Sequence, residues 1–348
     1  MRNPWRAAAV VALVGSLALA ACGGSSASEG GSGSDSSSSG AKTTLNLVAF
    51  SVPKAAHDAA QKAWGETPDG KGVTWRSSYG PSGDQSRAVA GGLKADLVHF
   101  SLGSDVTRLV DSGQVAKDWN TGPTKGIASS TVVVLVVRKG NPKNIKGWDD
   151  VVKPGIGIVS PNPGSSGSAR WNILAAYGHV IAKGGTPAEA EAFLTKLFKN
   201  VKALPGSGRD ATTAFQGGTG DVLLSYESEA ILARQSGADF DYIVPDETLL
   251  IENPAAVTEG ASAKAKDYLD YIESKDGQTV FAEKGWRPVV DGVDVTVKGA
   301  NDPSDPFPTP EKLLTIDGDF GGWSDAGKKF FDEDNGIVTK IQQATGKS

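Results

Sequence analysis

Cysteine is nearly absent from this sequence, because Cys22 is the only one in 348 residues. A single thiol excludes an intrachain disulfide and any metal site built from several cysteines. Histidine is scarce as well, and His57, His99 and His179 lie far apart in the chain. One cysteine and three separated histidines do not form a recognisable cluster of metal ligands in the sequence. We therefore expect neither a metal nor another cofactor.

Long hydrophobic runs are also lacking. The most apolar stretch, residues 7–21, has 15 residues, whereas a membrane-spanning helix needs about 20. It follows Arg2 and Arg6, an arrangement typical of a secretory signal peptide. Its end at Cys22 resembles the lipobox of bacterial lipoproteins, which implies a lipoprotein signal peptide over residues 1–22 and a diacylglyceryl group on the cysteine. The alternative is an ordinary signal peptide with an incidental cysteine.

Residues 23–42 are predicted to be a Gly/Ser-rich flexible tether. Residues 23–40 contain nine serines and six glycines, a composition that buries no apolar surface. The root-mean-square reach of such a coil is about 25 Å. A lipid on Cys22 would anchor the protein firmly, because two or more acyl chains hold a protein on a membrane. We expect a folded body held at the extracytoplasmic face of the cell membrane.

Positive charge is in deficit. The chain has 35 Lys and Arg against 40 Asp and Glu, so its formal net charge is −5. Without Arg2 and Arg6 of the leader the difference grows to −7. Binding of nucleic acid usually requires a basic face, so we expect no nucleic-acid partner. An anion site on such a chain must act through local groups, against the overall field.

From residue 43 onwards, short apolar runs alternate with helical patterns. Strands are predicted at 45–50, 73–78, 95–102, 130–142, 155–161, 221–227 and 241–245. Helices are predicted at 52–64, within 79–92, up to 176, at 187–201 and at 262–284. This alternation indicates an α/β fold with a largely parallel sheet. The body exceeds about 250–300 residues, where single cores stop growing, so two lobes are expected.

Four junctions between an extended segment and a helix have related sequences. They are SVPKAAHD from Ser51, SYGPSGDQSR from Ser78, PNPGSSGSARW from Pro161 and PGSGRDATTAF from Pro205. The first N–H groups of a helix are unpaired and carry partial positive charge, so such a start can hold an anion. For any one junction taken alone, helix capping is enough to explain its Pro, Gly and Ser residues. Four in one α/β chain favour a shared anion site, because ligands of open α/β sheets bind where these turns gather.

Longer segments resemble the sulfate/thiosulfate-binding proteins of bacterial ABC importers. The segments are NPKNIKGWDDVVKPGIGIVSPNPGSSGSARWNILAAYG (141–178), SYGPSGDQSRAVAGGLKADLVHFSL (78–102), LFKNVKALPGSGRDATTAF (197–215), GDVLLSYESEAIL (220–232) and LTIDGDFGGW (314–323). The block PNP-x-SSG-x-ARW in the first of them is highly specific. The resemblance extends over residues 44–335.

The resemblance implies a two-lobed, periplasmic-binding-protein-like α/β fold (type II), whose mixed, mainly parallel sheets are joined by crossover strands. Lobe 1 would begin with residues 43–125 and lobe 2 would comprise residues 126–248. Residues 249–348 would return to lobe 1 and end in C-terminal helices. The implied function is that of a monomeric solute-binding lipoprotein, not an enzyme. It would capture sulfate or thiosulfate between the lobes and deliver the anion to the permease subunits of an ABC importer.

The resemblance also assigns the groups that would hold the anion, motif by motif. The backbone N–H donors would be Val52, Ser82, Gly167, Ser168 and Gly208, the hydroxyl donor Ser166, and the aromatic donor Tyr226. The best-known members have tryptophan at this last position, and a phenol can donate through its O–H as an indole does through its N–H. Three arginines follow the turns and are expected to bond to nearby carbonyls or carboxylates, with direct contact to the anion as the alternative: Arg87, Arg170 and Arg209.

Sulfate chemistry agrees with such a donor set. The dianion has only acceptors, so a pocket of donors without a carboxylate suits it, whereas the proton of a phosphate would find no acceptor. Asp84 and Asp210 each lie within two residues of an expected donor. We expect these carboxylates to cap their helices and to point away from the anion.

Other functions remain open at this stage. The same scaffold could bind molybdate, tungstate or phosphate, or serve a sensory lipoprotein. A lipid-anchored serine hydrolase is a more distant alternative, because no Gly-x-Ser-x-Gly motif surrounds Ser82 or Ser166. The tryptophans Trp119, Trp148 and Trp171 are expected to pack in the core and not to bind a ligand.

Overall fold

Ten strands form one mixed sheet over residues 43–347, the part of the chain that the computed structural model describes. The predicted signal peptide, Cys22 and the predicted tether lie outside these residues. The strands are β1 (Thr44–Phe50), β2 (Thr74–Gly80), β3 (Leu97–His99), β4 (Ile127–Arg138), β5 (Ile158–Val159), β6 (Val201–Ala203), β7 (Val222–Tyr226), β8 (Phe240–Ile243), β9 (Glu247–Val257) and β10 (Lys312–Leu314).

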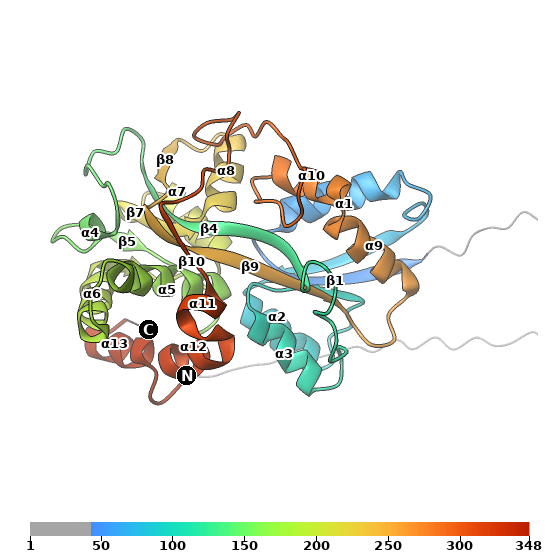
Figure 1. The fold of residues 1–348 in the computed structure, drawn as a ribbon, viewed down its shortest axis with the longest axis horizontal. Helices are drawn as coiled ribbons and strands as arrows, with labels where there is room; N and C mark the ends of the chain where they lie inside the picture. The colour runs from blue at the N-terminus through green and yellow to red at the C-terminus, as the bar shows by residue number, and fades with distance from the viewer. Residues whose placement is uncertain (1–42, 348) are drawn as a thin grey trace, which may run out of the picture. The chain divides into compact units, whose positions relative to one another are not determined.

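Helices flank this sheet (Figure 1). They are α1 (Lys54–Gly65), α2 (Ser82–Ala90), α3 (Gly103–Asp111), α4 (Trp148–Val151), α5 (Gly167–Ala182), α6 (Pro187–Asn200), α7 (Gly208–Gln216), α8 (Glu227–Gln235), α9 (Ala263–Glu273), α10 (Lys275–Glu283), α11 (Ile316–Phe320), α12 (Gly322–Phe331) and α13 (Ile337–Thr345). Among residues 43–347, no helix combines the length and the apolar character that crossing a membrane would require.

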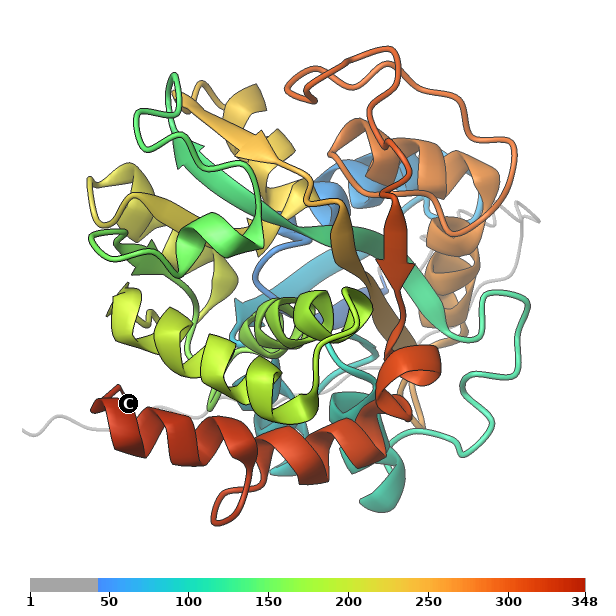
Figure 2. The same cartoon turned by 60° about the vertical axis from the view of Figure 1, so that its left-hand side comes forward.

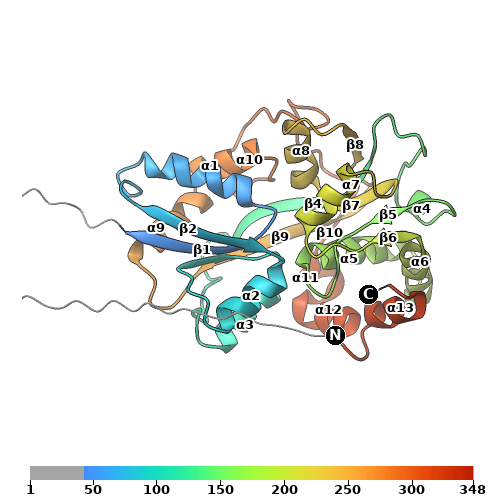
Figure 3. The same ribbon diagram turned by 180° about the vertical axis from the view of Figure 1, so that it is seen from behind.

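The order of the strands divides the sheet into two halves. The order is β2-β1-β3-β9-β4-β7-β5-β6, with β10 beside β9 and β8 beside β4, so β2 and β6 lie at opposite ends (Figure 3). Five pairings are parallel and four are antiparallel. We call β1–β3 with their helices the first half and β5–β8 with theirs the second half. The two long strands β4 and β9 pair with each other and link the halves.

Valine explains why β4 can run through the centre of the molecule. All residues of this strand except the first and the last are buried. Successive side chains of a strand point to opposite faces. Val133 and Leu135 therefore join the apolar cluster on one face, whereas Val132 and Val134 join the cluster on the other. A strand that is covered on both faces reads as a continuous apolar run.

The helices pack as their apolar patterns predict. Phe193, Leu194, Leu197 and Phe198 of α6 are buried, which confirms the predicted core face of this helix. Thr186 begins the helix with a reciprocal capping box to Glu189. Helices α9 and α10 pack on α1 in the first half, while the C-terminal helix α13 packs on α6 in the second half (Figure 2).

The fold differs from the sequence prediction in several places. Helices α3 and α8 and strand β10 were not predicted. The helix expected over 262–284 is two helices, because the backbone at Ser274 is extended and its hydroxyl accepts from the N–H of Gly277 to begin α10. The 11-residue strand β9 was not predicted. It contains Pro254, which pairs where the register between β4 and β9 shifts, next to Ile127. Proline has no N–H to donate to a regular ladder, so within sheets it occurs at irregularities of this kind.

Candidate anion-binding site

Three of the four related helix starts contact one another. Gly208 opens α7 and leaves no room for a side chain. A Cβ atom on Gly208 would lie 2.8 Å from Ser168 Oγ and 3.2 Å from a methyl group of Val52. Ser168 belongs to the first turn of α5, and Val52 precedes α1. The starts of α1, α5 and α7, which are far apart in the sequence, therefore meet at this point.

The fourth start joins them through backbone hydrogen bonds. The N–H of Gly83, in the first turn of α2, donates to the carbonyl of Ser165 at 3.3 Å. The hydroxyl of Ser165 donates in turn to the carbonyl of Gly206 at 2.8 Å. These bonds connect the starts of α2, α5 and α7. The predicted gathering of the four junctions is thus a feature of the structure.

A small cavity lies where these turns meet. It is a narrow gap that is too small to admit a water molecule, unlike the pockets of about 300–1,000 Å³ that are typical for organic ligands. Its lining residues are Val52, Pro161, Ser168, Asn172, Gly208, Leu224, Ser225, Tyr226 and Glu229. Four of these were expected as ligand contacts from the sequence. In the structure the four helix starts are therefore packed against one another, and an anion would fit between them only if these contacts separated.

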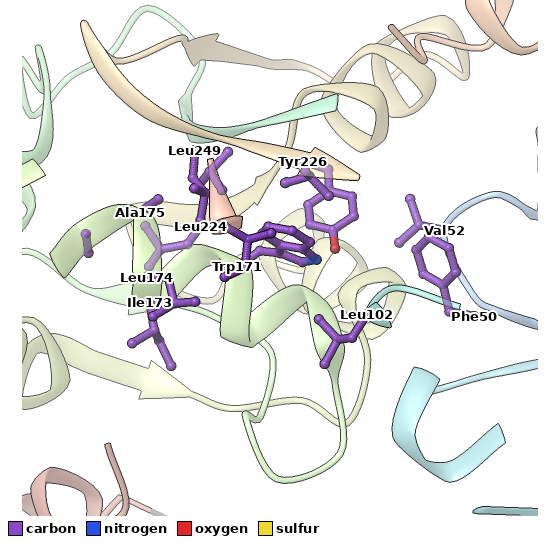
Figure 4. Close-up of a cluster of buried hydrophobic side chains, with 14 of the residues drawn as sticks. Phe50, Val52, Leu102, Trp171, Ile173, Leu174, Ala175, Leu224, Tyr226 and Leu249 are labelled. Carbon is purple, nitrogen blue, oxygen red and sulfur yellow. The ribbon is translucent and has the colours of Figure 1, made fainter. Parts of the chain in front are cut away.

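Tyr226 is held in place by a serine that the sequence did not single out. The phenol oxygen lies 2.8 Å from Ser101 Oγ, and the side chain is 1% exposed. Burial raises the pKa of the Tyr226 phenol, so this group keeps its proton and can donate. Figure 4 shows the Tyr226 ring beside Trp171, with Val52 and Leu102 nearby. The indole of Trp171 donates to the carbonyl of Ser101 at 2.9 Å, a packing role as expected.

The other expected contacts, Ser166, Gly167 and Ser82, do not line the gap but contact residues beside it. The hydroxyls of Ser166 and Ser168 are 2.8 Å apart and buried. A Cβ on Gly167 would lie 2.6 Å from Ser101, so this start of α5 packs tightly on the end of β3. The hydroxyl of Ser82 donates to Asp105 at 2.6 Å and is committed to the protein. Its expected contribution to an anion is the backbone N–H alone.

The two nearby aspartates do not line the cavity. Asp84 is exposed and pairs with Arg87 three residues later. Asp210 is also exposed, and its carboxylate accepts from the hydroxyl of Ser207, the N-cap of α7, at 2.7 Å. The expectation that they point away from the site holds, but the expectation that they cap their helices was wrong, because α2 has no side-chain cap and the cap of α7 is Ser207.

A carboxylate that the sequence did not indicate does line the cavity. Glu229 is 2% exposed and lies 2.8 Å from the Nε atom of Arg209. Burial raises the pKa of Glu229, and the adjacent Arg209 opposes this effect. Arg209 also donates to the carbonyl of Val52 at 3.3 Å, across to the first half. The expectation of a wall free of carboxylates was wrong, but the pair with Arg209 compensates the charge.

The third arginine of the turns is engaged with the backbone. Arg170 donates from Nε to the carbonyl of Pro163 at 3.0 Å, and its guanidinium lies 5.0 Å from the centre of the Phe331 ring. This arrangement fixes the loop that precedes α5 against α12. In each of the three cases the guanidinium has a protein partner.

Two of the three histidines, His57 and His99, form a buried network, whereas His179 contacts Asp149 and Glu247. Nε2 of His57 lies 2.8 Å from Nδ1 of His99, whose Nε2 lies 3.1 Å from the hydroxyl of Ser129. Burial lowers the pKa of His99 to about 3, which keeps the imidazole neutral. All three side chains of this network are fully buried. A serine–imidazole pair therefore exists, but a substrate has no access to it. Residues 43–347 contain no cluster of three metal-ligating side chains.

Residues 45–287 match the family described as bacterial extracellular solute-binding protein. The chain belongs to this family. Similar proteins include the sulfate-binding protein of Synechococcus elongatus, 38% identical over 99% of this chain and 97% of that protein. The sulfate-binding protein of Escherichia coli is 38% identical over 75% and 81% of the two chains. The thiosulfate-binding protein of Pseudomonas aeruginosa is 37% identical over 83% and 87%.

Two solved structures have the same architecture. The sulfate-binding protein SubI from Mycobacterium tuberculosis matches with a TM-score of 0.77 and 43% identity, over 83% of this chain and all of that one. A periplasmic thiamin-binding protein matches with a TM-score of 0.63 and 16% identity, over 78% of this chain and 90% of that one. The second likeness shows the fold alone. Both support the two-lobed, periplasmic-binding-protein-like fold for this member of the family.

Proposed function

We propose that this solute-binding protein captures sulfate or thiosulfate in the cavity at Gly208 and delivers it to an ABC importer. The observation that carries the proposal is the meeting of four helix starts, three of which line one narrow gap beside Tyr226, while the start of α2 bonds to the loop before α5. The relatives named for sulfate and thiosulfate binding support the choice of anion. They disfavour molybdate, tungstate, phosphate and hydrolase chemistry.

The physical basis of the proposal is a set of neutral donors. The N–H groups of Val52, Ser82, Gly167, Ser168 and Gly208, with the hydroxyls of Ser166 and Tyr226, would each donate to the anion. Hydrogen bonds to a charged group contribute about 1.5–3 kcal/mol each. The first turns of the helices also carry partial positive charge, which attracts an anion. Together these terms offset much of the desolvation of a dianion, while the ion pair of Glu229 and Arg209 leaves no uncompensated negative charge.

The cycle that follows from this site is closure, docking and release. Residues 43–125 would act as one lobe and residues 126–248 as the other, with residues 249–348 returning to the first lobe and supplying the C-terminal helices. The lobes would close on the anion, dock as a monomer on permease subunits, and part to release it. A lipid on Cys22 and the tether of residues 23–42 would hold the protein at the extracytoplasmic face of the membrane and raise its concentration near the permease.

Calorimetric titration tests the proposal. The purified protein is titrated at pH 7 with sulfate, thiosulfate, molybdate and phosphate in separate runs. We expect one site per molecule and tighter binding of sulfate or thiosulfate than of the other two anions. Sulfate should also raise the melting temperature, because a ligand that binds only the folded state stabilises it by mass action. Absence of heat and of stabilisation with both sulfur oxyanions would refute the proposal.

A further inference from the structure

A second cavity lies at the other end of helix α5. Its volume is about 330 Å³, within the 300–1,000 Å³ or so that is typical of pockets for small organic ligands. It lies between the C-terminal part of α5, the start of α6, strand β10 and helices α11 and α12, elements that lie close together in Figure 2. Its lining residues are Tyr177, Gly178, Ile181, Ala182, Pro187, Lys312, Leu314, Asp319, Phe320, Lys329 and Phe330.

The walls of this cavity are largely aromatic and aliphatic. The Tyr177 ring meets the Phe330 ring edge to face, with centres 4.8 Å apart, and Phe320 lies 6.5 Å from Tyr177. Ile181 is 40% exposed, which is unusual for a side chain of this size and marks an apolar edge of the cavity. Such walls favour a ligand with a flat or short apolar body.

Two lysines give the cavity a positive side. The Lys312 ammonium donates to the carbonyl of Ala182 at 3.2 Å, and the Lys329 ammonium lies 5.4 Å from the centre of the Tyr177 ring. Within residues 43–347, neither ammonium is paired with a carboxylate. An ammonium has three donors, so both lysines keep donors free. The carboxylate of Asp319 also lines the cavity and accepts from the N–H of Thr315 at 2.7 Å, so the lining has two positive groups and one negative group.

Tyr177 adds a polar group without a partner. The side chain is 3% exposed, and its hydroxyl has no hydrogen-bond partner in the described residues. Burial raises the pKa of the Tyr177 phenol, so the group keeps its proton. A buried hydroxyl without a partner costs about 1–3 kcal/mol. A ligand that accepts a hydrogen bond would recover part of this cost.

We propose that this cavity is a second ligand site, which takes a small amphipathic monoanion with an apolar body and a carboxylate or sulfonate head. The apolar body contacts the aromatic walls, and the head is placed near Lys312, Lys329 and the hydroxyl of Tyr177. The site is separate from the anion cavity. Tyr177 lies ten residues beyond Gly167 on α5, which corresponds to about 15 Å along the helix axis.

Three probes with the same benzyl body and different heads test the proposal. Phenylacetate, phenylacetamide and phenethylamine are anionic, neutral and cationic, respectively. Their binding to the purified protein is measured by saturation-transfer NMR and by calorimetry, with and without saturating sulfate. We expect phenylacetate to bind best, the amide about fivefold more weakly and the amine not at all, with sulfate changing none of these values.

Variants locate the binding. Lys329→Gln should weaken phenylacetate about fivefold, and Ala182→Trp should abolish its binding by filling the cavity. Lys328→Gln is the matched control, because Lys328 neighbours Lys329 on α12 but does not line the cavity. All three variants should bind sulfate as the unmodified protein does, which shows that they are folded. The proposal is overturned if phenylacetate fails to bind at millimolar concentration, competes with sulfate, or binds Lys329→Gln and Ala182→Trp unchanged.

Discussion

Hydroxyl groups around the anion cavity form hydrogen bonds with one another. Ser166 bonds with Ser168, and Tyr226 bonds with Ser101. Each hydroxyl is thereby held in one position, and a hydroxyl can turn its proton towards a new acceptor. Because the gap between these residues does not admit a water molecule, an anion can enter only if the contacts between the helix starts separate.

Ser166→Ala tests the contribution of a single hydroxyl. A hydrogen bond to a charged group is worth about 1.5–3 kcal/mol, so we expect the Kd for sulfate to rise about 10- to 100-fold. Calorimetry gives the Kd, and thermal unfolding shows whether the variant is folded. Ser236→Ala is the control, because that hydroxyl donates only to the carbonyl of Leu232 within its own helix. An unchanged Kd in Ser166→Ala would exclude Ser166 from contact with the anion.

The sequence predicts the residues of the turns better than the residues that support them. Val52, Ser168, Gly208 and Tyr226 could be identified because helix starts have recognisable Pro, Gly and Ser patterns and because a resemblance carried the aromatic donor. Ser101, Asn172 and Glu229 reach the cavity only through packing. One weak signal pointed to Ser101, since a serine directly after a buried strand lies at the sheet edge where ligands bind.

At the level of elements, the first turns of four helices carry the site. Gly208 shows how closely they approach, because a Cβ there would lie 2.8 Å from Ser168 Oγ and 3.2 Å from Val52. We expect Gly208→Ala to weaken sulfate binding at least about tenfold, because overpacking at such a contact costs 1–3 kcal/mol or so. Calorimetry and thermal unfolding measure the effects on binding and on stability.

Gly206→Ala is the matched control for this substitution. Gly206 lies two residues earlier in the same turn, and a Cβ there would meet nothing within 4 Å. Its effects on stability should stay within about 0.5 kcal/mol, and its affinity for sulfate should match that of the unmodified protein. Equal affinities for Gly208→Ala and Gly206→Ala would show that the starts of α1, α5 and α7 do not close on the anion as the structure suggests.

Among the elements with a strong local pattern, β4 and α6 were predicted but the amphipathic helix α3 was not. The valines of β4 and the apolar face of α6 identify these elements from sequence alone. The strand β9 escaped prediction because Asn253-Pro254 resembles a turn, whereas pairing with β3 and β4 holds it extended. The break at Ser274 was not predicted because the apolar pattern continues from α9 into α10.

At the scale of the whole molecule, the site is shared between the two halves of the sheet. Val52 and the start of α2 belong to the first half, and Ser168, Gly208 and Tyr226 belong to the second. Backbone contact between the halves is direct, because the N–H of Gly83 donates to the carbonyl of Ser165. Opening of the halves would break this bond and divide the donor set, so release of the anion should require separation of the halves.

A disulfide across this contact tests that requirement. In a Cys22→Ser background the chain has no other cysteine, so Gly83→Cys with Ser165→Cys can form only one bridge. The two backbones are in hydrogen-bond contact, and disulfides join Cα atoms about 4.4–6.8 Å apart. The protein is loaded with radiolabelled sulfate, oxidised and chased with unlabelled sulfate. We expect the oxidised protein to retain label at least about tenfold longer than the reduced protein or either single variant, because the halves cannot part. Equal release before and after oxidation would mean that sulfate leaves without separation of the halves.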